Sequence, residues 1–112
     1  MAYDESLARR IRDLLIGQAG ITEKKMFGGI VFLREGLMFV GVSDKSLMAR
    51  IGPTAYEAAL RRRHVREMDF TGKPMKGYVF IEESGLKADQ DLAYWIRLCN
   101  DFVATLPPRR AK

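Results

Sequence analysis

Cysteine and histidine are almost absent from this chain, whose 112 residues include one cysteine, Cys99, and one histidine, His64. A lone cysteine excludes an internal disulfide and is typical of proteins from a reducing compartment. Two such residues are too few for a transition-metal site. His64 lies in an arginine-rich run, and the sequence assigns no serine or cysteine nucleophile to it. We therefore expect a protein that is not an enzyme and that needs no cofactor.

Long hydrophobic runs are also missing. No stretch approaches the roughly 20 apolar residues of a membrane span, and the polar, charged N-terminus lacks the apolar core of a signal peptide. We therefore expect a cytoplasmic protein. Its length fits one globular domain, which we place at residues 1–108, and a flexible basic tail at residues 109–112.

Positive charge is in excess, but little of the excess lies within the predicted fold. The net charge is +5, and Arg109, Arg110 and Lys112 of the tail account for most of it. Without these three, 16 basic residues stand against 14 acidic ones. A dedicated DNA-binding domain concentrates far more charge on one face, so the overall charge argues weakly for nucleic acid.

One basic patch remains within the fold, at Arg61, Arg62, Arg63 and Arg66. Three or four phosphate contacts there would make log K fall with log salt at a slope of about −3 to −4. The alternative function is therefore a nucleic-acid-associated protein that uses this patch and the basic tail. No aromatic residues interleave with the arginines to stack bases. We favour a solvated helix terminus, where positive charge is stabilising.

A β-hairpin organises the chain. Apolar residues fill 30–33 and 37–40, and a polar break containing Gly36 separates them, as expected for a bulged turn with glycine at a positive φ. Residues 23–27 are expected to enter the first strand, bent at Gly28-Gly29. Strands that face water on one side alternate in polarity, whereas these arms do not. They predict a central hairpin that is covered on both faces.

The remaining elements follow from apolar periodicity and from turn residues. We expect a helix at 5–17, a third strand at 47–51, a second helix from 52–54 to 61–64, a strand at 77–82 and a last helix at 89–105. Residues 65–70 are irregular or a short strand. The order α-β-β-β-α-β-β-α predicts an α+β fold, a two-layer antiparallel sheet with helices packed on it.

Three helices would mostly cover one face of such a sheet, which leaves apolar side chains on the other face. We therefore predict a non-enzymatic interaction domain, either a homodimer or bound to a protein partner. In the other possible arrangement, one helix crosses to the second face and closes it. The predicted surface is one of two sets: Val31, Leu33, Met38 and Val40, or Ile30, Phe32, Leu37 and Phe39.

Two short motifs, KMFGG at 25–29 and KPMKGY at 73–78, occur together with YDE at 3–5, LMARIG at 47–52, MDF at 68–70 and LPP at 106–108. With these the chain resembles the TfoX/Sxy N-terminal domain family over nearly its whole length. The resemblance implies a small two-layer α+β fold like that of secretion-chaperone-like proteins. It also implies a relation to regulators of natural transformation, which promote transcription together with the cyclic-AMP receptor protein. It implies no catalytic residues.

Lys24 and Lys25 stand beside Gly28 and Gly29, and a glycine-rich backbone with nearby lysines can wrap an anion. Glycine pairs in strands more often permit a bulge or the close approach of another backbone segment. We favour that structural role over a phosphate cradle.

A second polar candidate is formed by Asp69, Lys73 and Lys76, which flank one predicted turn. The spacing does not fit a Walker A loop, because Glu67 and Pro74 stand where glycine and Ser or Thr are required. A small-ligand site at these three residues is the least favoured function. A surface salt bridge worth less than about 1 kcal/mol is the simpler interpretation.

Overall fold

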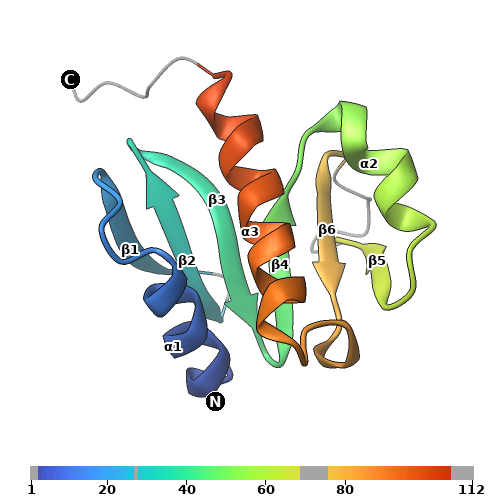
Figure 1. Ribbon diagram of the computed structural model, residues 1–112, viewed down its shortest axis with the longest axis horizontal. Coiled ribbons are helices and arrows are strands. Elements are labelled where there is room, and N and C mark those ends of the chain that lie inside the picture. Colours follow the sequence, from blue (N-terminus) through green and yellow to red (C-terminus); the bar gives the residue numbers. More distant parts are fainter. Residues whose placement is uncertain (1–2, 27, 69–75, 107–112) are drawn as a thin grey trace.

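A computed structural model describes residues 3–26, 28–68 and 76–106 (Figure 1). The chain forms an α+β fold, as expected, with three α-helices and a six-stranded sheet among these residues. The elements are α1 (Glu5–Leu14), β1 (Ile21–Met26), β2 (Gly29–Arg34), β3 (Leu37–Ser43), β4 (Ser46–Arg50), α2 (Pro53–Leu60), β5 (Val65–Glu67), β6 (Tyr78–Ile81), the 3₁₀ turn η1 (Glu83–Gly85) and α3 (Asp89–Ala104).

The sheet is antiparallel throughout, in the order β1-β2-β3-β4-β6-β5. It has one strand more before α2 than the sequence predicted, because β1 is a separate strand that pairs back along β2. Gly28 allows this reversal, since its φ of 73° is a conformation that few residues other than glycine adopt. The segment expected to bend at Gly28-Gly29 therefore turns back completely.

The predicted hairpin is formed by β2 and β3. Arg34 pairs with Leu37, so a two-residue turn of Glu35 and Gly36 connects the strands. Both turn residues have positive φ, 52° for Glu35 and 81° for Gly36. Positive φ at both central positions matches the right-handed twist of the flanking strands. The positive φ predicted for Gly36 is confirmed, and the connection is shorter than expected.

All three helices pack on one face of the sheet (Figure 1). Leu7 and Ile11 of α1, Tyr56 of α2 and Trp95 of α3 belong to one buried cluster with the strand residues that face them. The start of α1 is fixed by Asp4, whose Oδ1 accepts hydrogen bonds from the backbone amides of Ser6 (2.9 Å) and Leu7 (3.3 Å). The expectation that the helices cover one face is confirmed.

The helix ends differ slightly from the predicted ones. α1 ends at Leu14 instead of residue 17, because the chain turns there and Gly17 takes a φ of 89°. α3 ends at Ala104, one residue before the expected end. Among the residues with described coordinates, no helix combines the length and hydrophobicity that a membrane crossing requires. The predicted tail at 109–112 lies outside the described residues.

Candidate functional site

The eight hairpin residues predicted as an interaction surface are more buried than expected. The side chains of Ile30, Val31, Phe32, Phe39 and Val40 are at most 3% exposed. Those of Leu33, Leu37 and Met38 are half-buried, and none of the eight is exposed. The hairpin therefore presents no open apolar surface, and the predicted site needs correction.

A β-bulge in β3 determines which hairpin residues face the helices. Phe32 pairs with Val40 and Leu33 pairs with Met38, so Phe39 is an extra residue on its strand. Two successive residues of a bulge can point to the same side, and both Phe39 and Val40 belong to the helix-side cluster. Of the two predicted sets, Ile30, Phe32, Leu37 and Phe39 all pack on the helix side. The other set faces away from the helices except for Val40, which the bulge moves into the helix-side core.

The second face of the sheet has a small core of its own. Val31, Met48, Met68 and Phe80 form a buried cluster there that contains no helix residue. Gly41 lies across from Val31 and Met48, and a Cβ on it would overlap their side chains. Neither arrangement considered from the sequence occurs: this face is neither left open nor closed by a helix of the described chain.

Exposed aliphatic side chains occur at another place, the end of α1. Among the residues whose burial is described, the exposed large hydrophobic ones are Leu14 (37%), Ile16 (78%) and Tyr94 (42%). Leu15, between the first two, is buried in the core. Leu14 is on the same side of α1 as Leu7, two turns earlier, but it is the last residue of the helix and is only partly covered, and Ile16 lies beyond the helix end. The chain thus exposes two large aliphatic groups within three residues.

A groove lies beside Leu14, between the end of α1, the end of β2 and the side of α3. We name it the α1–α3 groove. It has a volume of about 330 Å³ and is lined by Leu14, Gln18, Arg34, Ala93, Ile96, Arg97, Asn100, Asp101 and Ala104. A smaller hollow of about 160 Å³ shares Arg34 and Ala104 with it and is also lined by Glu35, Leu37, Val103 and Leu106.

A chain of hydrogen bonds fixes the polar side chains of the groove. Arg34 of β2 donates from Nη1 to Oδ1 of Asn100 at 2.5 Å, and Asn100 donates from Nδ2 to Oε1 of Gln18 at 2.9 Å. This network connects the sheet, α3 and the segment after α1. Because its members are hydrogen-bonded to one another, the groove is preorganised. Leu14 lines it, and Ile16, two residues further along the chain, is exposed.

Sequence reasoning missed this groove, because it expected one helix over residues 5–17 and no surface at its end. One signal was present. Leu14, Leu15 and Ile16 are three consecutive apolar residues just before Gly17, and a helix that ends there cannot bury all three on one face. The walls of the groove come from β2 and α3, which are remote from α1 in the sequence.

The four arginines of the predicted basic patch do not converge. The guanidinium of Arg62 lies over the rings of Tyr94 and Trp95 on α3, 4.6 and 5.1 Å from their centroids. Arg66 lies over Phe80 on the second sheet face at 4.6 Å and forms an ion pair of 3.5 Å with Glu82. Arg61 and Arg63 are exposed, and neither forms an ion pair with another described residue. Two of the four arginines therefore have structural roles on different faces.

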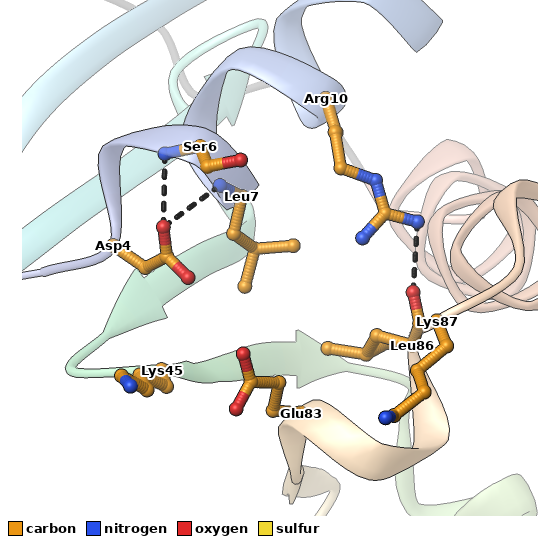
Figure 2. A pocket seen from close by; sticks show the side chains of 8 residues that line it. All are labelled: Asp4, Ser6, Leu7, Arg10, Lys45, Glu83, Leu86 and Lys87. Carbon is orange, nitrogen blue, oxygen red and sulfur yellow. Dashed lines mark hydrogen bonds between the residues drawn. The ribbon is translucent and has the colours of Figure 1, made fainter.

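A second hollow, of about 280 Å³, lies between the start of α1 and η1 (Figure 2). Arg10 donates to the carbonyl oxygen of Leu86 at 2.7 Å and forms an ion pair with Asp89 at 3.1 Å. Asp4, on the same wall, caps α1. These groups hold α1 against the segment before α3, so their observed contacts are structural ones.

Two polar candidates from the sequence remain: the glycine pair beside Lys24 and Lys25, and the cluster of Asp69, Lys73 and Lys76. A Cβ at Gly29 would overlap the carbonyl group of Val42, so this glycine permits a close approach of two strands, as favoured above. Asp69 and Lys73 lie outside the described residues, and Lys76 is exposed. The ligand site predicted from these three residues therefore gains no support.

Cys99 is fully buried in the helix-side core, and this burial raises the pKa of its thiol. A thiol that stays protonated is neither a nucleophile nor a metal ligand, so Cys99 acts as a small apolar residue. In the described part of the chain, no three acidic, histidine or cysteine side chains gather as metal ligands would.

Comparison with known proteins gives one result. Neither a curated protein nor a solved structure matches the chain significantly. The TfoX N-terminal domain matches residues 13–103, a range that extends from the end of α1 to the end of α3 and includes the whole sheet. The chain therefore belongs to the TfoX N-terminal domain family.

Proposed function

We propose that this chain is a non-enzymatic, cytoplasmic regulatory domain that acts by protein contact, and that it forms a homodimer through the α1–α3 groove. Membership of the TfoX N-terminal domain family supports a regulatory, competence-related role. The single, buried cysteine is typical of a reducing compartment.

The observation that carries the proposal is the position of Ile16. Its side chain is 78% exposed and lies two residues beyond Leu14, which lines a preorganised groove. A two-fold interface uses the same patch on both subunits, so that a group protruding from one subunit meets a hollow on the other. Ile16 supplies the protruding group, and the groove that Leu14 lines supplies the hollow, so the same part of the chain can provide both halves of such an interface.

The charges in the groove agree with self-association. Of the three charged residues that line it, Arg34 is hydrogen-bonded to Asn100, and Arg97 and Asp101 are exposed. A copy related by a two-fold axis would bring the acidic group of one subunit near the basic group of the other. A partner of one charge sign would meet attraction at one of these groups and repulsion at the other.

Light scattering during gel filtration tests the proposal. At tens of micromolar we expect the mass of a dimer for the natural chain and the mass of a monomer for Ile16→Glu, because the glutamate would place a charge in the apolar contact. Since Ile16 is exposed, the substitution should leave the circular dichroism spectrum unchanged. Ala58→Glu, at an exposed position of α2, serves as the matched control and should remain dimeric.

A monomeric natural chain at these concentrations would overturn the homodimer. If the chain is dimeric and Ile16→Glu has no effect, the dimer uses a different surface and the assignment to the groove is wrong. Affinity capture from the native host with both variants then shows whether the regulatory partner depends on Ile16.

A further inference from the structure

The outer edge of β1 carries a second, independent feature. In the described part of the chain, β1 has one neighbour, β2, and lies at the end of the sheet (Figure 1). It spans six residues, whereas β5 at the opposite end spans three. An edge strand exposes backbone N–H and C=O groups that can pair with another strand. β1 therefore offers the longer docking edge.

The charges on β1 are not balanced. Glu23 is bound by Arg12, whose Nε and Nη2 donate to the two carboxylate oxygens at 2.7 and 3.0 Å. Lys24 and Lys25 are exposed, and neither forms an ion pair with a described residue. Since successive side chains alternate along a strand, one lysine lies on each face of the sheet. An added strand would meet a positive group on both faces.

These charges disfavour a second copy as the added strand. If two copies of β1 pair antiparallel about a two-fold axis, the residue on the axis lies opposite the same residue of the other copy. An axis at Glu23 or Lys25 opposes like charges, which is destabilising in a sheet. An axis at Lys24 opposes the two Lys24 side chains, and Glu23 could pair with Lys25 of the other copy only by leaving Arg12. An axis at Thr22 pairs only half of the strand. The lysines thus oppose self-pairing at this edge and favour a negatively charged strand.

We propose that β1 binds an extended acidic segment of a partner protein by strand addition, with the carboxylates of the segment paired to Lys24 and Lys25. This inference rests on the proposed function in one respect, that the chain acts by protein contact. It concerns a different surface from the α1–α3 groove. Backbone hydrogen bonds would supply affinity, and the two lysines would select acidic side chains.

Selection from a displayed library of random dodecapeptides, with the full chain as bait, tests this proposal. We expect enrichment of peptides with Asp or Glu at neighbouring positions. A synthetic copy of an enriched peptide, labelled with fluorescein, should bind the natural chain in fluorescence anisotropy. The double variant Lys24→Glu/Lys25→Glu should bind at least tenfold more weakly, and Lys45→Glu/Lys87→Glu, which changes charge equally elsewhere, should bind normally.

Amide hydrogen exchange then locates the bound peptide, and we expect increased protection at residues 21–26. The proposal is overturned if no peptide is enriched, if the enriched peptides are not acidic, if the Lys24 and Lys25 variant binds as well as the natural chain, or if protection appears elsewhere. Ile16→Glu should bind the peptide normally. Failure at this edge is therefore distinguishable from failure of the groove dimer.

Discussion

The guanidinium of Arg12 and the carboxylate of Glu23 form a two-bond ion pair that joins α1 to the edge strand β1. The hydrogen bond to Glu23 raises the pKa of Arg12 above its ordinary value. Both side chains are more than a third exposed, so solvent screens the pair. We expect Glu23→Gln to lower the free energy of unfolding by about 0.5 to 1 kcal/mol.

Urea denaturation checks this prediction, and the loss should shrink in 1 M NaCl because salt screens exposed pairs. Glu57→Gln, at an exposed position of α2 where no described ion pair occurs, is the matched control. An equal loss in the two variants would show that the pair with Arg12 contributes nothing.

The bulge in β3 makes a prediction about two adjacent residues. Phe39 is fully buried on the helix side, whereas Met38 is half-buried on the other side. We expect Phe39→Ala to cost about 3 to 5 kcal/mol of unfolding free energy, because it opens a cavity in the main core. Met38→Ala should cost clearly less. Thermal or urea unfolding measures both, and the reverse order would contradict the bulged register.

The two neighbouring glycines should respond differently to a methyl group. Gly29→Ala should cost about 2 to 3 kcal/mol, because the new Cβ overlaps the Val42 carbonyl and the strands must separate. Gly28→Ala meets open space and should cost about 1 to 2 kcal/mol, the strain of an alanine at a φ of 73°. Urea unfolding compares them. Equal costs would contradict the close approach at Gly29.

Cys99 should be inert in the folded protein. Burial raises the pKa of its thiol, so thiolate is scarce even in mildly alkaline solution, and the side chain is closed to solvent. We expect labelling by a thiol reagent at pH 8 to proceed at the rate of unfolding and to become immediate in concentrated urea. Fast labelling in native buffer would mean that α3 separates readily from the sheet.

The basic patch should bind duplex DNA weakly and with little dependence on salt. Arg62 and Arg66 are held against aromatic rings, which leaves Arg61 and Arg63 for phosphates. Two contacts give a log K versus log salt slope of about −2 at most. Fluorescence anisotropy with a labelled duplex measures the slope. A slope near −4 that Arg62→Ala and Arg66→Ala reduce would support the nucleic-acid function instead.

Much of the fold could be predicted from local pattern. The apolar period placed α1 and α3 to within a few residues, and the glycine in the polar break marked the turn at Gly36. These features depend on neighbours in the sequence, which a periodic pattern records.

The features that could not be predicted depend on residues remote in the sequence. The partners of Arg62 are Tyr94 and Trp95, on a helix that begins well after it. The register that makes Phe39 the extra residue is set by pairing with β2. The groove requires α1, β2 and α3 together. No local pattern contains such pairings, so the sequence did not predict the groove or the exposed residues at the end of α1.

The extra residue in β3 also bears on how much of the strand reaches the core beneath α3. Because Phe39 and Val40 share a side, Leu37 returns to the helix side at the hairpin end and joins Arg34 beneath α3. Deletion of Phe39 would remove the bulge and keep the pairs of Leu33 with Met38 and of Arg34 with Leu37, so Leu37 would stay on the helix side and the core would lose one aromatic ring. The bulge therefore lets β3 contribute two adjacent side chains to the core at one level of the sheet, while the register of the hairpin end stays that of a regular antiparallel pair.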